Sequence, residues 1–185
     1  MKRPLLAAVG VLAVLALAAS QAQAACPAKP VDRTFLPWLD LAYYQKAPDS
    51  GFENGGSWAL AGGATLVDGN QPYLAGVRSL DLPPGSSATS APICVTVAHP
   101  TVRFFARNAG SVLAPLTVTV EFKTLLGLKL EVPVGLVLGG AEWQPTLPLL
   151  FLGNLLSNEV RFRLTAAPGS AWQVDDVYVD PYSKG

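Results

Sequence analysis

Two adjacent carboxylates near the C-terminus, Asp175 and Asp176, interrupt a segment that otherwise has the pattern of a β-strand. Residues 171–180 alternate and are rich in β-branched and aromatic side chains. A charged side chain on the buried face of a strand is costly unless it has a charged partner or coordinates a metal ion. We therefore expect a compensating partner for at least one of these aspartates.

Strand alternation assigns the two aspartates to opposite faces. Asp175 shares a face with Val177 and Val179, which we predict to be inward. Asp176 shares the other face with Trp172, Val174 and Tyr178, which we predict to be outward. Besides a metal ion, two partners remain open for Asp175: hydrogen bonds from backbone amides, or an ion pair with Arg78.

The residue types needed for common catalytic sites are sparse. The single histidine, His99, precedes Pro100 in an expected turn, and no Gly-x-Ser-x-Gly motif accompanies it. One histidine and two cysteines are too few for a zinc cluster, and no phosphate-binding glycine motif follows a strand. A glycosidase would need two facing carboxylates, and no pattern places any two of the candidates opposite each other. These candidates are Glu121, Glu131, Glu142 and Glu159. We predict that the chain is not an enzyme.

A binding surface is easier to propose than a catalytic one. Alternation in residues 101–107 points Arg103, Phe105 and Arg107 outward from a strand. An exposed ring flanked by guanidiniums can stack on a sugar while the arginines bind hydroxyl or acidic groups. Arg161 and Arg163 would join this surface if their strand lies nearby, and Tyr178 could add a second ring. The alternative is that Phe105 lies beneath a loop or against the N-terminal arm.

The elements that must position these residues are predicted to be short strands. Residues 116–123 and 160–164 alternate strictly between apolar and polar side chains. Residues 125–138 favour two short strands, whereas 146–156 could form a helical turn. With 17 glycines and 16 prolines, nine or ten such strands predict an all-β antiparallel sandwich, with a jelly roll as first choice.

The N-terminus has the pattern of a signal peptide. Lys2 and Arg3 precede an apolar run, 4–19, that is shorter than the roughly 20 residues of a membrane-spanning helix. We place cleavage after Ala24, with Ala25 as the rival site, and an uncleaved anchor as the alternative. The predicted organisation is a signal peptide (1–24), an arm with a first strand (25–50) and a sandwich domain (51–182). We expect a secreted or envelope-associated protein with no membrane span after cleavage.

The two cysteines predict a disulfide, and the net charge limits the class of binding partner. Cys26 and Cys94 most simply form one disulfide in an exported chain, worth roughly 4 kcal/mol on the loop-entropy model. Without Lys2 and Arg3, 11 basic residues stand against 13 acidic ones, a net charge of −2. This near-balance and the lack of a basic run argue against a nucleic-acid partner.

Two separated motifs resemble a known family. Gly51-Phe52-Glu53 is followed by Trp58-Ala59-Leu60, and residues 172–177 supply a closing strand of apolar-Asp-Asp-Val type. Together they resemble the jelly-roll carbohydrate-binding modules, which share the galactose-binding-domain-like sandwich. The phrase Arg-Phe-Phe-Ala-Arg-Asn at 103–108 also resembles a group of uncharacterised secreted proteins from actinobacteria, which supplies no function.

The first resemblance implies a function and a metal site. It implies a non-catalytic domain that binds a glycan or cell-envelope polymer, with a structural calcium ion held by Glu53 and Asp175. Calcium takes six to eight oxygen ligands, which the sequence alone does not enumerate. The competing interpretation is an envelope structural or adhesion protein that binds another protein. An exposed leucine-rich segment, 125–156, would favour that interpretation.

Overall fold

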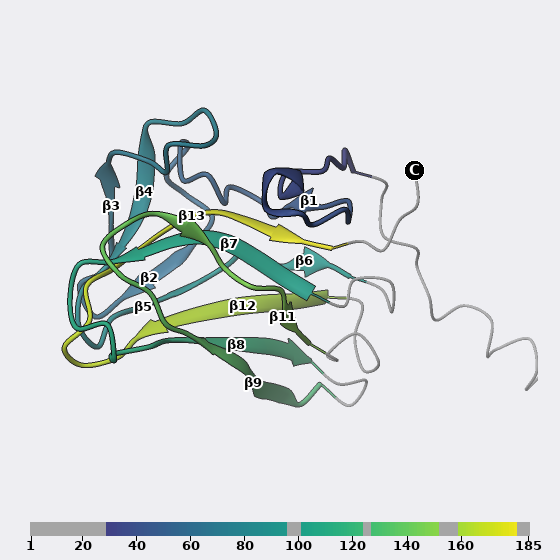
Figure 1. Ribbon diagram of the computed structural model, residues 1–185. Helices are drawn as coiled ribbons and strands as arrows, with labels where there is room; N and C mark the ends of the chain where they lie inside the picture. Colours follow the sequence, from purple (N-terminus) through teal and green to yellow (C-terminus); the bar gives the residue numbers. More distant parts are fainter. Residues whose placement is uncertain (1–28, 96–100, 124–126, 152–158, 181–185) are drawn as a thin grey trace, which may run out of the picture.

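The chain folds into two antiparallel sheets packed face to face (Figure 1). The computed structural model describes residues 29–95, 101–123, 127–151 and 159–180. A seven-stranded sheet has the order β10-β7-β13-β4-β3, with β1 beside β13 and β11 beside β7. Its strands are β1 (Gln45–Lys46), β3 (Thr65–Asp68), β4 (Arg78–Leu82), β7 (Thr101–Asn108), β10 (Gln144–Pro145), β11 (Leu149–Leu150) and β13 (Trp172–Val179).

The second sheet has six strands in the order β2-β5-β12-β8-β9, with β6 also paired to β12. Its strands are β2 (Ala59–Ala61), β5 (Ser87–Thr89), β6 (Ile93–Cys94), β8 (Leu116–Lys123), β9 (Lys129–Val137) and β12 (Glu159–Ala166). All the pairings in both sheets are antiparallel. The prediction of an all-β antiparallel sandwich is confirmed.

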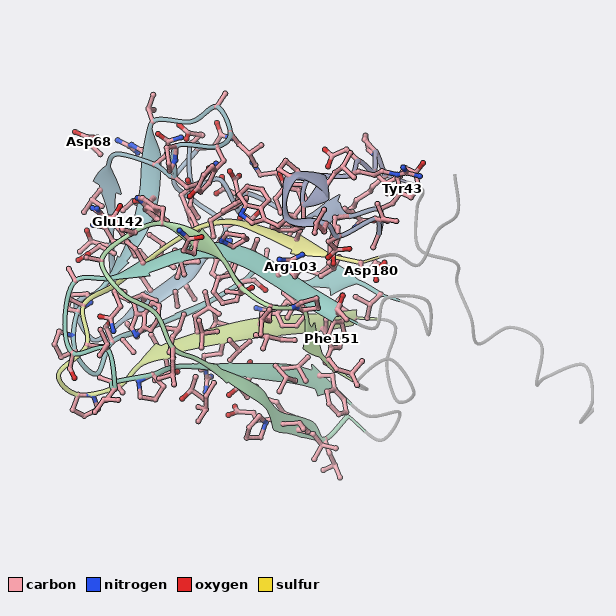
Figure 2. The ribbon with its side chains drawn as sticks, viewed as in Figure 1. Tyr43, Asp68, Arg103, Glu142, Phe151 and Asp180 are labelled. Atoms are coloured by element: carbon pink, nitrogen blue, oxygen red, sulfur yellow. The ribbon has the colours of Figure 1, made fainter. Side chains whose placement is uncertain are left out.

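The main core lies between the sheets, where the alternating strands bury their apolar sides (Figure 2). On β8 and β12 the even-numbered residues are apolar and buried, and the register sets Val120 opposite Phe162. Trp172, Phe104 and Leu80 close the core from the seven-stranded sheet. The polar residues of β8 and β12 therefore face away from the core, as their sequence pattern predicts.

Several predicted boundaries differ from the observed ones. Residues 129–137 form one strand instead of two, because Pro133 and Gly135 lie on an edge strand, where a missing ladder hydrogen bond is tolerated. The short Ser-Ala-Thr strand β5 was not among the strands predicted from the sequence. Within 146–156, Leu149–Leu150 forms β11, and 152–156 lies outside the described residues.

The N-terminal arm lies over the outer side of the seven-stranded sheet. It contains a single 3-10 turn, η1 (Leu36–Trp38), and then β1, which pairs with the last two residues of β13. The predicted signal peptide, Cys26 and His99 lie outside the described residues, so the signal peptide and the Cys26–Cys94 disulfide stay predictions. Among the described residues, no helix is long and apolar enough to cross a membrane.

Candidate functional site

The predicted ligand-binding face of β7 is covered by the arm. Phe105 is fully buried, and its ring stacks against Phe35 of the arm at a centroid distance of 5.4 Å. Tyr178 is also buried and meets Phe35 edge-on at 5.7 Å. The expectation that Phe105 and Tyr178 offer exposed rings is therefore wrong. The alternative, in which Phe105 lies against the arm, is confirmed.

Arg103 anchors the arm to β7 (Figure 2). Its guanidinium pairs with Asp40 of the arm, and its Nε donates to the carbonyl of Thr146 at 2.8 Å. The same group lies 4.0 Å above the ring of Phe35. Because only 5% of the Arg103 side chain is exposed, its hydrogen-bonding groups are used within the protein and do not face a ligand.

Asp40 collects several donors at this contact. The hydroxyl of Tyr44 donates to it at 2.7 Å, and the amide of Ala42 donates at 3.0 Å. Burial alone would raise the pKa of Asp40, but the hydrogen bonds from Tyr44, Ala42 and Arg103 outweigh that effect and lower it. The carboxyl group of Asp40 is therefore ionised at neutral pH and serves as the counter-ion of Arg103.

Arg107 is the one member of the predicted triplet that stays partly exposed. Its Nε donates to the side-chain oxygen of Gln173 at 2.9 Å, and its guanidinium lies 5.4 Å from the ring centre of Trp143. Because it lies at the margin of the covered face, Arg107 does not form one open surface with Arg103 and Phe105.

Arg161 and Arg163 lie on β12 in the six-stranded sheet, so the structure does not bring them together with the arginines of β7. The predicted ligand-binding set therefore divides between two sheets. Alternation along a strand defines which residues share a face, but it does not specify which sheet the strand joins.

The outer side of the six-stranded sheet carries a row of linked charges. Glu121 on β8 is only 4% exposed and pairs with Arg163 and with Lys129 of β9, the latter at 3.0 Å. Glu131 also pairs with Lys129, at 3.0 Å, and with Arg163, at 3.1 Å. Nε of Arg163 also donates to the hydroxyl of Thr89 at 3.3 Å. The hydrogen bond between Lys129 and Glu131 raises the pKa of Lys129 and lowers that of Glu131.

We call this outer side the polar face. Strand register places the following outward residues on it: Ser87, Thr89, Thr117, Thr119, Glu121, Lys129, Glu131, Pro133, Leu136, Arg161, Arg163 and Thr165. Apart from Glu121, each of these residues is exposed or partly exposed. With strands about 4.8 Å apart, the four strands from β5 to β9 span about 14 Å. Apart from Pro133 and Leu136, the residues of this face are polar, and none of them has an aromatic ring.

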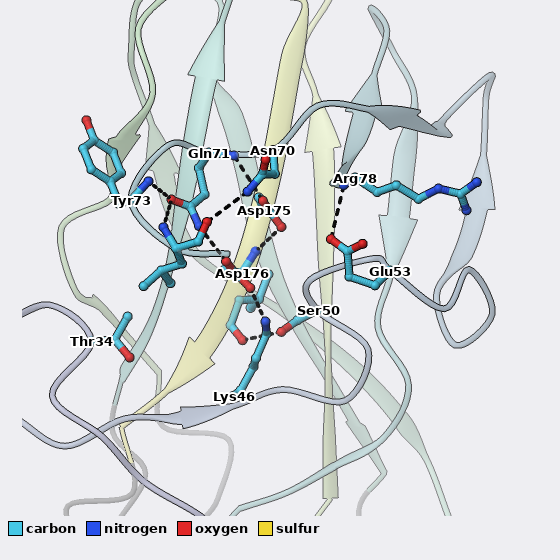
Figure 3. Close-up of polar contacts among 12 residues, drawn as sticks. Thr34, Lys46, Ser50, Glu53, Asn70, Gln71, Tyr73, Arg78, Asp175 and Asp176 are labelled. Carbon is cyan, nitrogen blue, oxygen red and sulfur yellow. Dashed lines mark hydrogen bonds and ion pairs between the residues drawn. The ribbon is translucent and has the colours of Figure 1, made fainter. Parts of the chain in front are cut away.

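A different polar cluster surrounds Asp175 and Asp176 (Figure 3). The ladder between β13 and β7 shifts register between Asp175 and Tyr178, and Asp176 adopts a left-handed backbone conformation with φ of 49°. This β-bulge reverses the alternation: Trp172 and Val174 face the core before it, and Val177 and Val179 do so after it.

The bulge corrects the predicted faces of both aspartates. Asp175 lies opposite Phe105, whose ring belongs to the aromatic cluster under the arm, so Asp175 does not share the core-facing side of Val177. Asp176, which we predicted to face outward, is also buried, with only 2% of the residue exposed. Both carboxyl groups lie where β13 passes from its neighbour β4 to its neighbour β1.

Hydrogen-bond donors surround these carboxyl groups. Asp175 accepts the backbone amide of Gln71 at 3.2 Å and the amide of Asp176 at 2.8 Å, which confirms the backbone-amide alternative. Asp176 accepts the side-chain amide of Gln71 at 2.8 Å and pairs with Lys46 of β1. Burial, together with the neighbouring Asp176 charge, raises the pKa of Asp175 to about 8.

Glu53, the other predicted calcium ligand, has separate contacts. Its Oε1 accepts the backbone amide of Val77 at 2.8 Å and that of Arg78 at 3.2 Å; Figure 3 shows the contact with Arg78. Calcium would need a shell of oxygen atoms, whereas amide hydrogens and an ammonium group contact these carboxylates. The described residues contain no group of three His, Cys, Asp or Glu side chains suited to a metal. The residues present therefore fit calcium poorly, and the predicted ion stays a prediction.

Sequence reasoning missed the partners of these charges. Asp40, Gln71 and Lys46 were not singled out, because each acts on a residue more than 60 positions away. The ion pairs of Glu121 could have been predicted if the strand order β12-β8-β9 had been known. In that order β8 lies between the strand that carries Arg163 and the strand that carries Lys129. Strand order is a property of the whole chain, so no local pattern carried that signal.

A cavity of about 240 Å³ lies between the end of β9 and the segment that carries β10 and β11. Leu136, Leu138, Leu147 and Leu149 contribute to its wall together with Trp172. The first three leucines are more than 60% exposed. This region is apolar and differs in chemistry from the polar face.

The comparisons with known proteins find likeness only among solved structures. No protein-family model matches the chain, and no curated protein matches it. The CBM22-1 xylan-binding domain of Paenibacillus barcinonensis Xyn10C is 17% identical, with a TM-score of 0.56 over 76% of this chain and 99% of that domain.

Two larger proteins contain a similar unit. One is the Clostridium thermocellum xylanase 10B fragment with CBM22-1 and GH10 modules, complexed with xylohexaose: 13% identity, TM-score 0.57, covering 73% of this chain. The other is the enzymatically active domain of bacteriophage CBA120 tailspike protein 4: 14% identity, TM-score 0.55, covering 72% of this chain. This chain spans only 28% and 21% of their respective lengths. These comparisons confirm the predicted jelly-roll type of sandwich and the resemblance to carbohydrate-binding modules at the level of the fold.

Proposed function

We propose that this chain is an exported, non-catalytic carbohydrate-binding domain whose ligand face is the polar face of the six-stranded sheet. The observation that carries the proposal is the fixed row of Glu121, Arg163, Glu131 and Lys129 on an open sheet surface. The fold likeness to xylan-binding modules supports the same class of ligand. The N-terminal pattern at 1–24 supports export.

The chemistry of the polar face suits a polyhydroxylated ligand. Carboxylates accept hydrogen bonds from sugar hydroxyls, and guanidiniums donate to their oxygens. Arg163 is held by Glu121, Glu131 and Thr89, so part of the ordering cost of binding is already met in the free protein. Because the face carries no aromatic ring, recognition would rest on hydrogen bonds and charge instead of ring stacking.

Arg161 provides the sharpest test, since its side chain is exposed and lies opposite Glu121 in the ladder. The assay is retention of the exported chain in native gels that contain xylan, β-galactan or an acidic polysaccharide, followed by titration of the retained ligand. We expect Arg161→Ala and Arg163→Ala each to weaken binding by about 10-fold to 100-fold, the value of a charge-assisted hydrogen bond.

The matched control is Arg78→Ala on β4. Arg78 is also exposed, but it belongs to the seven-stranded sheet. The Arg78→Ala variant should bind the glycan with the same affinity as the unmodified chain. Binding to no polysaccharide, or equal binding by the Arg161, Arg163 and Arg78 variants, would refute the proposal.

The apolar region around the cavity favours a second candidate function, an envelope protein that binds another protein. Leu136, Leu138 and Leu147 line the cavity and are each more than 60% exposed. A gathered apolar surface of this kind is typical of protein interfaces. A double variant, Leu138→Ser with Leu147→Ser, should abolish capture of an envelope protein and leave glycan binding unchanged if both surfaces act separately.

A further inference from the structure

The bulge in β13 buries two carboxyl groups side by side. Asp175 is 1% exposed and Asp176 is 2% exposed. Removing two adjacent acidic groups from water is strongly unfavourable unless a cation or several hydrogen-bond donors replace the lost hydration. Gln71 supplies two of the donors, one from its backbone and one from its side chain. A positive charge is still required for Asp176.

Lys46 supplies that charge from the neighbouring strand. It lies opposite Tyr178 in the β1–β13 ladder, two residues beyond Asp176, and its ammonium pairs with Oδ1 of Asp176. The Lys46 side chain is 45% exposed, whereas that of Asp176 is 3% exposed, so the lysine reaches from the surface to a buried acid. The flexible four-carbon stem of lysine allows its ammonium group to reach a partner at this distance from the surface.

The backbone at Gly51 closes around this ion pair. A β-carbon at position 51 would lie 2.7 Å from the ammonium nitrogen of Lys46 and 3.1 Å from Oδ1 of Asp176. Both distances are shorter than ordinary van der Waals contact. The chain therefore passes closely over the pair at a position where only glycine fits without displacing it.

We propose that the Lys46 ammonium is the built-in cation of the β13 bulge, where it pairs with Asp176 beside Asp175, the residue that the family resemblance names as a calcium ligand. A single positive charge on a side chain pairs directly with Asp176, and amide hydrogens satisfy the remaining carboxylate oxygens. Such a site needs no shell of oxygen ligands. The sandwich would thus be fastened at this point without a metal. This inference is independent of the proposed glycan binding.

The first test compares the unmodified chain with and without metal. Its melting temperature should be the same in EDTA and in millimolar calcium chloride. A bound structural ion would instead stabilise the folded state by mass action, and EDTA would lower the melting temperature. That lowering would overturn the proposal and support the calcium site.

The second test removes the charge of Lys46. Lys46→Met keeps a long stem and should lower the melting temperature by roughly 5 to 10 °C, because it leaves a buried acid without its cation. Lys46→Arg keeps the charge and is the matched control, with a much smaller change. The double variant Lys46→Met with Asp176→Asn should recover most of the loss, since the unpaired charge is then absent.

The double variant also protects the test against a failure to fold. If Lys46→Met alone is recovered unfolded, the double variant should still fold, and failure of both would overturn the proposal. An unchanged melting temperature for Lys46→Met would overturn it as well. So would a double variant that is no more stable than Lys46→Met.

Discussion

Removal of the Asp40 carboxylate should weaken the attachment of the arm to the seven-stranded sheet. In the Asp40→Ala variant, Arg103 keeps its bond to the carbonyl of Thr146 and its position over Phe35, but it loses its counter-ion. The hydroxyl of Tyr44 and the amide of Ala42 lose their acceptor at the same time. The variant therefore leaves one nearly buried cation and two polar groups unsatisfied.

The expected cost follows from the exposure of the two partners. Breaking a buried ion pair from one side typically costs 3–5 kcal/mol, because the remaining charge stays buried. Arg103 is 5% exposed, which favours the full cost, whereas Asp40 is 18% exposed, which lets water replace part of the carboxylate. We therefore expect Asp40→Ala to destabilise the docked arm by about 3 kcal/mol. Arg103→Met, which removes the buried cation, should cost less than Asp40→Ala.

The assay is a double-mutant cycle read by hydrogen exchange and by urea unfolding. The amide of Tyr44, bonded to the carbonyl of Asp32 at 2.7 Å, reports on the arm alone. The double variant Asp40→Ala with Arg103→Met should be destabilised by clearly less than the sum of the single variants, with a coupling of at least 1 kcal/mol. Strict additivity, or unchanged exchange at Tyr44 in Asp40→Ala, would refute the assignment of this pair as the anchor of the arm.

Two further predictions concern the bulge and a tight turn. Because Asp175 has a raised pKa of about 8 in the folded state and an ordinary value of 3.8, the folded state retains a proton between those pH values that the unfolded state has lost. The contribution of Asp175 to stability is therefore fully present below about pH 4 and falls as the pH rises toward 8, by at most about 1.4 kcal/mol per pH unit. The urea midpoints at pH 5 and pH 8 should differ less in the Asp175→Asn variant than in the unmodified chain. The same pH dependence of the midpoint in the variant and the unmodified chain would contradict this. At Gly110, a β-carbon would lie 2.6 Å from the carbonyl oxygen of Gly169 and 2.7 Å from the nitrogen of Ala171. Gly110→Ala should lower the free energy of unfolding by urea by roughly 2–3 kcal/mol. The matched control Gly140→Ala, whose β-carbon would have no atom within 4 Å, should leave it nearly unchanged. Equal stabilities of the two variants would show that the turn at Gly110 relaxes freely.

Local sequence patterns predicted those strands that have one apolar side and one polar side. The strict alternation of 116–123 and 160–164 corresponds to β8 and β12, which pair with each other over seven residues in the six-stranded sheet. The sandwich class followed from these strands together with the frequent turns. Strand β5 was missed because Ser87, Ala88 and Thr89 are small and carry no alternation in hydrophobicity.

The faces of the site strands were harder to predict, for two physical reasons. A one-residue bulge at Asp176 reverses the alternation of β13, and such a bulge leaves little trace in a single sequence. The outward side of β7 is covered by Phe35 and Trp38, which lie more than 60 positions earlier in the chain. Both effects depend on contacts distant in sequence.

The arginines of β7 and β12 show why residue type alone did not identify the proposed ligand face. Arg103 pairs with Asp40 of the arm and Arg163 with Glu121 of β8, and each also bonds a further oxygen. Their side chains differ in exposure, 5% for Arg103 and 32% for Arg163, because the arm covers only the seven-stranded sheet. A covered guanidinium contributes to stability, whereas a partly open one retains donors for a ligand. The position of the arm, set by Phe35 and Asp40, therefore leaves the outer side of the six-stranded sheet uncovered, which supports the proposal that a glycan binds there.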